Sequence, residues 1–544
     1  MRNLFAARYS IKIQYFVVLL ALYYTFVLNR PLLGKLFELG QESGLVLFQY
    51  SAPVLLFSLL VVLFSLVSIP YLFKPFMMFL TLTSAVAMYG VEQYHISLGV
   101  SMMENVFETN SSEAGTYLNA SSIGFILLYG VLPCMLIGWF KIDYPKGIWG
   151  QFKPRLALML VGVICIGSVL GTQYKNYASI GRNNHYLGGM IIPAQFFNSI
   201  KYLNNTYFST PLEYISVGDD AQLASSQNNK PSLVVMILGE TARAQNFTQN
   251  GYDRNTNPYT ASEGLISLNK VTSCGTYTAL SVPCMFSDLK QADYDKAMAL
   301  SRDSIVDVIA KAGVETLWIE NDGGDKGAAQ PNHIVNANEL NSPFCNTEYC
   351  YDESMLAPMQ TFIEGKSQDK FLVLHTMGSH GPTYWQRYPA DMETFEPSCN
   401  QSDIEHCSDD AIRNVYDNTI VYTDYFIEKV IETLKSYQEH YNIALTYVSD
   451  HGESLGENGM YLHGTPYAMA PAEQTHVPWL FWLPEQYVQA KGIDRACFSH
   501  MASQESFSHD NLYHSLLGIY GIKTQAKSDQ LDMFSRCSRP SSHA

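Results

Sequence analysis

The stretch VTSCGTYTALSVPCMFSDL, residues 271–289, places one hydroxyl, that of Thr278, between Cys274 and Cys284. The residues before Thr278 are typical of a turn, and the apolar run after it predicts a helix that begins near this threonine. A helix N-terminus gathers free backbone N–H groups and the positive end of the helix dipole, which favours a phosphate there. Taken alone, the stretch is better explained as a helix cap beside a structural disulfide.

Two further polar stretches, GETAR at residues 239–243 and SDHGESLGENGMYLHG at residues 449–464, each follow a short apolar run. Such runs alternate with helical stretches in this part of the chain, which predicts an α/β domain with a mainly parallel central sheet. Sites in open α/β sheets lie beyond the carboxyl ends of the strands, so the polar residues after them are expected to converge. The predicted strands are residues 232–238, 314–319, 371–374, 444–448 and 478–483; the predicted helices are residues 301–312 and 412–436; the residues expected to converge are Glu240, His375, Asp450 and His451.

Five apolar segments open the chain, each close to the ~20 residues that a helix needs to cross the hydrocarbon core. They are residues 13–28, 45–69, 73–90, 122–140 and 156–172. The first segment lacks a small-residue cleavage site, which favours an anchor over a cleaved signal peptide. Lys and Arg gather at the N-terminus and in loop 141–155, whereas loop 91–121 contains neither. By the positive-inside rule, the N-terminus lies inside and everything after residue 172 lies outside.

This pattern divides the chain into three predicted parts. Residues 1–172 form a five-span transmembrane domain, and residues 231–544 form the α/β domain. Between them, residues 173–230 combine an aromatic-rich stretch with a polar linker. The aromatic stretch fits an amphipathic helix lying in the membrane interface, and it fits an ordinary domain connector equally well.

Composition limits the cellular compartment in which the protein folds and the class of partner that it binds. Asp and Glu number 50 against 34 Lys and Arg, and the net charge of −16 argues against a nucleic-acid partner. Eight of the ten cysteines lie beyond the apolar segments, an even number typical of disulfides formed in an oxidising compartment. No CxxC pair occurs, which argues against a cysteine metal site. Proximity and elimination pair Cys274 with Cys284, Cys345 with Cys350, Cys399 with Cys407 and Cys497 with Cys537, although sequence alone does not prove connectivity.

Four motifs carry a family resemblance: GETAR (239–243), SCGTYTALSVPC (273–284), HTMGSHGPTY (375–384) and SDHGESLGENGMYLHG (449–464). In these motifs, and over nearly its whole length, the chain resembles the lipid A phosphoethanolamine transferases. This group includes the mobile colistin-resistance enzymes and lies within the alkaline phosphatase superfamily. The resemblance implies a monomeric inner-membrane enzyme with an alkaline phosphatase/sulfatase-like periplasmic domain. It also implies phosphatidylethanolamine as donor and a phosphate of lipid A as acceptor.

The resemblance further implies a Zn²⁺ ion and a covalent route. The matching zinc ligands are Glu240, Thr278, Asp450 and His451. In such a route Thr278 attacks the donor phosphorus, and the lipid A phosphate then attacks phospho-Thr278, so that one difficult displacement becomes two. The added ammonium lowers the negative charge of the surface and gives resistance to polymyxin and other cationic peptides. The alternative for Glu240 is a carboxylate at a helix start, paired with Arg243.

Further positions match substrate-binding residues of the family. His380 and His463 correspond to histidines that sit at the substrate phosphate and can bind further zinc, whereas His375 fits a loop-orienting role as well as a functional one. Lys326 corresponds to a lysine near the phosphoethanolamine, but Gly323 stands where the colistin-resistance enzymes often carry serine. The headgroup contacts implied are Asn105, Thr109 and Glu113, which are spaced i, i+4, i+8 and would share one face of a helix.

Four alternatives remain at this point. In the first, the acceptor is an inner-core sugar of lipopolysaccharide rather than lipid A. In the second, the chain is a related phosphoglycerol transferase. The third is a sulfatase, which would need a formylglycine-forming Cys or Ser at the nucleophile, and Thr278 argues against it. The fourth is a catalytically inactive membrane module, and the intact set of implied zinc ligands argues against that.

Overall fold

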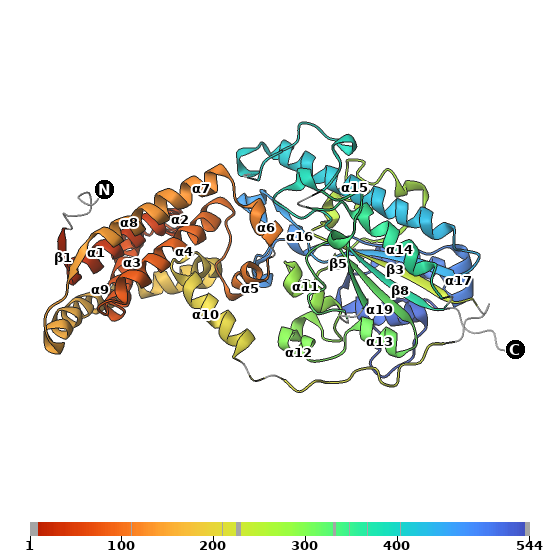
Figure 1. The fold of residues 1–544 in the computed structure, drawn as a ribbon, viewed down its shortest axis with the longest axis horizontal. Helices are drawn as coiled ribbons and strands as arrows, with labels where there is room; N and C mark the ends of the chain where they lie inside the picture. The colour runs from red at the N-terminus through yellow and green to blue at the C-terminus, as the bar shows by residue number, and fades with distance from the viewer. Residues whose placement is uncertain are drawn as a thin grey trace. The chain divides into compact units, whose positions relative to one another are not determined.

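The structure of the chain is a computed structural model that describes residues 9–109, 111–208, 210, 212–224, 230–329, 333–346, 349–366, 368–402 and 404–538. It contains two compact units (Figure 1). The first comprises Met1–Phe107 and Leu118–Ser209, and the second comprises Glu108–Tyr117 and Thr210–Ala544.

The first unit is mainly helical. Four of its helices are long and apolar enough to cross a membrane, and a pair bent by 64° would make a fifth span if it counts as one. The predicted segment 13–28 falls in this bent pair, so the number of spans is four or five. The four helices are Val46–Leu66, Phe73–Gln93, Ala120–Trp139 and Trp149–Gly181, and the bent pair is Ile13–Leu28 with Arg30–Gln41.

The bend in that pair is held by Asn29, which is fully buried between the two helices. Its side-chain amide donates hydrogen bonds to the carbonyls of Tyr24 (2.9 Å) and Ile192 (2.8 Å), and its oxygen accepts from the N–H of Ile192 (2.9 Å). These bonds satisfy the buried amide of Asn29 and tie the bend to the backbone of Ile192. Helix α10 (Ala194–Tyr207) follows in the region predicted to bridge the two parts of the chain.

The second unit is built on a seven-stranded mixed sheet in the order β4-β12-β9-β3-β8-β6-β7. The five strands from β9 to β7 are parallel, and β12 runs antiparallel to both β9 and β4. Their bounds are β3 (Ser232–Gly239), β4 (Ile266–Leu268), β6 (Glu315–Glu320), β7 (Ile334–Asn336), β8 (Lys370–His375), β9 (Asn442–Ser449) and β12 (Trp479–Trp482). All eight residues of β3 and all eight of β9 are buried, as expected for central strands with helices on both faces.

Helix α15 (Asp409–Lys435) lies on one side of this sheet, and α13 (Ile305–Lys311) and α19 (Asp510–Tyr520) lie on the other (Figure 1). Helix α13 begins four residues later than the predicted helix because Ser304 and Asp307 form a capping box at its start. Helix α15 has a capping serine, two aspartates in its first turn and a lysine in its last turn, and each of these stabilises an end of the helix.

One segment from the predicted transmembrane range belongs to this second unit. Helix α6 (Ser111–Thr116) lies in Glu108–Tyr117, which groups with the α/β domain. Within the unit, Lys296 at the start of α12 (Lys296–Leu300) forms an ion pair with Glu108, with 2.9 Å between Nζ and Oε1.

The second unit contains four disulfides. They join Cys274 to Cys284, Cys345 to Cys350, Cys399 to Cys407 and Cys497 to Cys537. The pairing by proximity and elimination is therefore confirmed, and Cys134 and Cys165 of the first unit remain as thiols.

We expect a thiol reagent applied to unfolded but unreduced protein to modify Cys134 and Cys165 alone. A disulfide sulfur carries no proton to lose, so it does not react as a thiolate nucleophile. Peptide mass spectrometry would locate the label, and a reduced sample, in which all ten cysteines should react, is the control. Label on any cysteine of the second unit in the unreduced sample would refute the scheme.

Candidate active site

Neighbouring parallel strands bring the polar residues of the motifs together. Strand β3 ends at Gly239 and β9 ends at Ser449, and these two residues are register partners. Glu240 and Asp450 follow directly, so the sheet places them side by side, and the N–H of Thr241 donates to Asp450 Oδ1 (3.2 Å). The expected convergence at the carboxyl edge of the sheet is observed.

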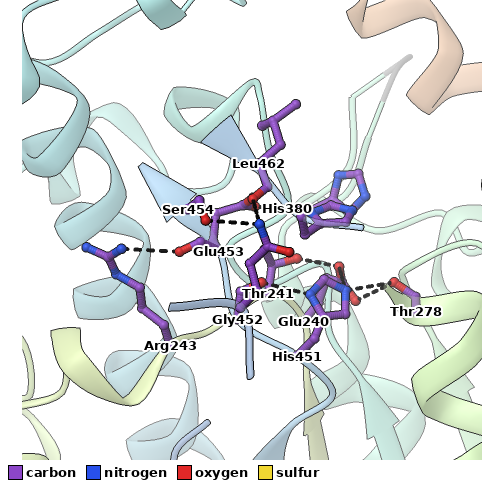
Figure 2. Close-up of polar contacts among 12 residues, drawn as sticks. Glu240, Thr241, Arg243, Thr278, His380, His451, Gly452, Glu453, Ser454 and Leu462 are labelled. Carbon is purple, nitrogen blue, oxygen red and sulfur yellow. Dashed lines mark hydrogen bonds and ion pairs between the residues drawn. The ribbon is translucent and has the colours of Figure 1, made fainter. Parts of the chain in front are cut away.

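Thr278 is the first residue of α11 (Thr278–Met285), where the sequence predicted a helix start. The N-cap is Tyr277, in an extended conformation, so Thr278 does not cap the helix. Its hydroxyl instead donates to Glu240 Oε2 (3.0 Å) and lies 3.4 Å from His451 Nε2 (Figure 2). The helix is tied to the end of β9 because the hydroxyl of Ser281 donates to the carbonyl of Asp450 (2.6 Å). The local sequence therefore aims the threonine oxygen at the carboxylate.

Glu240, Asp450 and His451 form a fully buried group whose nearest donor atoms all lie within 4.8 Å of one another. His451 Nε2 is 3.5 Å from Glu240 Oε1 and 3.3 Å from Asp450 Oδ2. His451 Nδ1 lies 2.9 Å from the carbonyl of Gly452, and a carbonyl only accepts, so Nδ1 carries the proton. The lone pair of Nε2 is then directed at the two carboxylates and the threonine.

The electrostatics of this group favour a bound cation. Burial lowers the pKa of His451 to about 4, which leaves the imidazole neutral at pH 7, the form that binds metal. Burial and the neighbouring charge of Glu240 raise the pKa of Asp450 well above its ordinary value. Asp450 Oδ2 is buried without a hydrogen-bond partner among the described residues. An unpartnered carboxylate oxygen beside a neutral imidazole and a hydroxyl fits a metal ion with oxygen and nitrogen ligands.

His380 and His463 lie beside this group. The ring centroids of His451 and His463 are 4.6 Å apart, and those of His380 and His463 are 5.8 Å apart. Burial lowers the pKa of His380 to about 3. His463 Nδ1 lies 3.3 Å from Glu453 Oε2, a fully buried carboxylate that sequence reasoning missed. The signal was available, because Glu453 stands in the same motif as Asp450.

Arg243 does not pair with Glu240, which removes that alternative. Its guanidinium donates instead to Glu457 Oε1 (2.6 Å) and to the backbone carbonyl of Glu453 (3.2 Å), as Figure 2 shows for the latter. Arg243 thus holds the segment after His451, and Glu240 remains available to the threonine and the cluster.

Gly378 allows the loop after β8 to pack against the backbone of Glu240. Its φ is +50°, and a Cβ added here would lie 2.7 Å from the carbonyl oxygen of Glu240, closer than side chains tolerate. The adjacent N–H of Ser379 donates to that same carbonyl (3.0 Å). This glycine in the motif GSHGP therefore fixes the position of Glu240 from the side of β8.

The remaining predicted site residues are placed less centrally. His375 is buried with Nδ1 2.8 Å from Glu320 Oε2, and it forms a second group with Glu240 and Asp322. Lys326 has its ammonium 3.1 Å from the carbonyl of Gly323.

The three predicted headgroup residues do not share one helix. Asn105 lies in α5 (Val100–Glu108), Thr109 lies between α5 and α6, and Glu113 lies in α6. The spacing gives a shared face only if the segment is one continuous helix, and that condition is not met, because α5 ends at Glu108. The side chain of Glu113 lies outside the described part of the structure.

Comparison with known proteins agrees with this site. Residues 232–522 match the sulfatase family, and residues 56–207 match the family described as phosphoethanolamine transferase EptA/EptB. The chain is 37% identical to the phosphoethanolamine transferase EptA of Escherichia coli K12, covering 98% of each protein. It is 34% identical to the phosphatidylethanolamine transferase Mcr-1 of Escherichia coli, covering 94% of this chain and 96% of the relative. The integral membrane lipooligosaccharide phosphoethanolamine transferase A of Neisseria meningitidis superposes with a TM-score of 0.95 at 34% identity, covering 98% of this chain and 100% of that one.

Proposed function

Because this chain belongs to the phosphoethanolamine transferase family, we infer that it transfers phosphoethanolamine from phosphatidylethanolamine to a phosphate group of lipid A. The observation that carries the chemistry is the buried hydroxyl of Thr278, held 3.0 Å from Glu240 Oε2 and 3.4 Å from His451 Nε2. A hydroxyl needs such neighbours to become a nucleophile at neutral pH. We propose that the product confers resistance to polymyxin and other cationic peptides by lowering the negative charge of the surface.

In the proposed first step, the oxygen of Thr278 forms a bond to the donor phosphorus, and the bond from phosphorus to the diacylglycerol oxygen breaks. Glu240 Oε2 already accepts the hydroxyl hydrogen bond, so it is placed to take the threonine proton. In the second step, a phosphate oxygen of lipid A forms a bond to the phosphorus of phospho-Thr278, the bond from phosphorus to the threonine oxygen breaks, and a proton carried in on the lipid A phosphate restores the threonine hydroxyl. Phosphoethanolamine is thereby moved in two displacements with a covalent intermediate.

We assign His380 and His463 to binding the phosphoryl oxygens and to protonating the leaving diacylglycerol oxygen. Burial lowers the pKa of His380 to about 3, so this imidazole is neutral in the resting protein. We propose that it receives from Glu240 the proton released by Thr278 before it delivers that proton to the leaving oxygen. The carboxylate of Glu453, whose Oε2 lies 3.3 Å from His463 Nδ1, is assigned to orienting the His463 ring.

We propose that the metal ion is Zn²⁺ and that Glu240, Asp450, His451 and the oxygen of Thr278 hold it. The support is the unpartnered Oδ2 of Asp450, the neutral imidazole of His451 and the absence of thiolate from the described group. A bound Zn²⁺ would lower the pKa of a hydroxyl coordinated to it, and it would offset the negative charge of the phosphate.

Headgroup recognition is a separate part of the proposal. An ammonium is bound by carboxylates and hydrogen-bond acceptors, which Glu113, Asn105 and Thr109 supply by residue type. Lys326 is proposed to contact the phosphate of the donor. Gly323 has no side chain, so no contact from this position is proposed.

We also propose the arrangement of the chain in the cell. Residues 1–172 form a five-span domain in the inner membrane with the N-terminus in the cytoplasm, residues 173–230 bridge the interface, and residues 231–544 form the periplasmic catalytic domain with its mainly parallel sheet. The enzyme acts as a monomer. The disulfides support an oxidising compartment for the last of these parts.

The test is mass spectrometry of lipopolysaccharide from cells that lack related transferases, with and without this protein. We expect lipid A to gain the mass of one phosphoethanolamine per modified phosphate. Phosphoethanolamine found only on core sugars would show that the acceptor is a core sugar and not lipid A. Addition of phosphoglycerol would show that the donor is not phosphatidylethanolamine. Unchanged lipopolysaccharide in cells that contain the folded, membrane-inserted protein would contradict the proposal.

A further inference from the structure

We propose that the chain binds a second divalent cation, of the zinc type, between Glu240, Asp322 and His375. This extends the proposed zinc site because the two sites share Glu240, but it does not depend on which residue is the nucleophile. The three side chains form the second of the two groups whose donor atoms all lie within 4.8 Å of one another in the described part of the chain.

The sheet brings these residues together from three neighbouring strands. Strands β3, β8 and β6 are adjacent and parallel, and His375 at the end of β8 is the register partner of both Leu238 and Glu320. Glu240 lies two residues beyond Leu238, and Asp322 lies two residues beyond Glu320. All three proposed ligands are buried, with Asp322 8% exposed and the other two fully enclosed.

The orientation of His375 is the observation that points to a cation. Its Nδ1 lies 2.8 Å from Glu320 Oε2, and Glu320 is itself held by the indole N–H of Trp318 (2.8 Å). A carboxylate at Nδ1 fixes the proton there and leaves a lone pair on Nε2. This Nε2 is buried without a hydrogen-bond partner in the described residues. A carboxylate behind a histidine whose other nitrogen faces acidic groups is the usual surrounding of a metal-bound imidazole.

The separation of the ligand atoms of His375 and Asp322 fits a shared metal ion better than a hydrogen bond between them. His375 Nε2 is 3.7 Å from Asp322 Oδ2, which is too long for a hydrogen bond. Two ligand atoms that each lie about 2.0–2.2 Å from one ion are separated by roughly 3–4 Å, and the observed separation falls in this range. Two buried carboxylates beside the lone pair of Nε2 form a negatively charged group that a bound cation would stabilise.

The donor set also limits the ion. One imidazole nitrogen and two carboxylate oxygens are ligands that zinc accepts, whereas magnesium prefers oxygen ligands alone. Glu240 would then lie against both ions, because its Oε2 already accepts from Thr278 in the first site. A second positive charge on the β8 side of Glu240 would help to hold this shared carboxylate in its ionised form.

The test is the zinc content of the purified full-length protein in detergent. The protein is stripped with chelator, dialysed against excess Zn²⁺ and freed of unbound metal, and zinc per chain is measured by elemental mass spectrometry. We expect two equivalents for the natural sequence and one for Asp322→Asn. The matched control is Asp325→Asn, which removes the same charge in the same loop but from a carboxylate that accepts from the N–H of Ala329 (2.8 Å); it should keep two.

A second variant separates this site from the histidine pair. The double variant His380→Ala/His463→Ala keeps all three proposed ligands and should retain two equivalents. One equivalent in the natural sequence, or two in folded Asp322→Asn, overturns the second site and leaves the first intact. No bound zinc in the natural sequence overturns both sites. If Asp322→Asn does not fold, the double variant decides, since a fall from two to one there assigns the second ion to the histidines and overturns the proposal.

Discussion

Thr278→Ala should abolish lipid A modification, with a loss on the order of 10³–10⁶-fold, the scale seen when a covalent nucleophile is removed. The hydroxyl is the group that donates to Glu240 Oε2, and alanine leaves that carboxylate with no oxygen to activate. Helix α11 should persist because Thr278 does not cap it. The measurement is the rate of phosphoethanolamine transfer by full-length protein in vesicles that contain phosphatidylethanolamine and lipid A.

Two variants make this experiment specific. Thr278→Ser keeps the oxygen and should retain part of the rate, whereas Thr361→Ala removes the same atoms from an exposed threonine that only bonds its own helix and should retain all of it. Near-normal transfer by Thr278→Ala, in protein with its four disulfides intact, would exclude Thr278 as the nucleophile.

Asp450→Asn should separate metal binding from folding. The substituted side chain keeps the oxygen that accepts from the N–H groups of Thr241 and His451. Its amide nitrogen takes the place of the unpartnered Oδ2, which lies 3.3 Å from His451 Nε2 in the natural protein. The metal-free variant should therefore be more stable than the metal-free natural protein, by about 1–3 kcal/mol, because a buried unsatisfied acceptor is removed. Transfer should fall by more than the ~10–100-fold typical of losing an outer-shell partner.

The matched control is Asp424→Asn, another fully buried aspartate. Both of its oxygens accept hydrogen bonds, among them those from the N–H groups of Tyr259 (2.7 Å) and Thr260 (3.1 Å). This variant should lose about 1–3 kcal/mol of stability, because the new amide NH₂ faces hydrogen-bond donors and cannot accept from them. It should nevertheless keep its zinc. Thermal unfolding with and without chelator, together with zinc analysis, checks both variants. Full zinc content and full activity in Asp450→Asn would remove Asp450 from the metal site.

Much of the site follows from the sequence because its residues stand directly after buried strands. Glu240 and Asp450 each begin the segment after an apolar run, and parallel strands end at one edge, so their proximity needs no knowledge of strand order. The cluster of Asp322 with His375 was not predictable in this way. It depends on β8 lying between β3 and β6, and a row of similar apolar runs does not specify which strands are neighbours.

Local propensity also failed where a contact elsewhere decides the structure. The spacing of Asn105, Thr109 and Glu113 matches a helix, but α5 ends at Glu108. Glu108 then pairs with Lys296, which lies far away in the sequence. Arg243 is close to Glu240 in sequence, yet it pairs with Glu457 because the chain after β9 returns to it. The end of a helix and the partner of a charged residue can depend on contacts with residues distant in sequence. A short sequence window does not contain those residues.

The pairing of β3 with β9 has a consequence for biosynthesis. Thr241 and Asp450, which are hydrogen-bonded in the folded protein, are separated by 209 positions in the chain. At a synthesis rate of about 5–20 residues per second, roughly 10–40 s pass between the making of Glu240 and the arrival of its partner carboxylate. During this time β3 lacks β9, and until residue 375 has been made it lacks β8 as well, so no nascent chain can assemble the complete cluster. A ribosome that stalls, or a gene that is cut short, between residues 182 and 449 therefore yields a protein with all the described helices of membrane-spanning length but without Asp450 and His451.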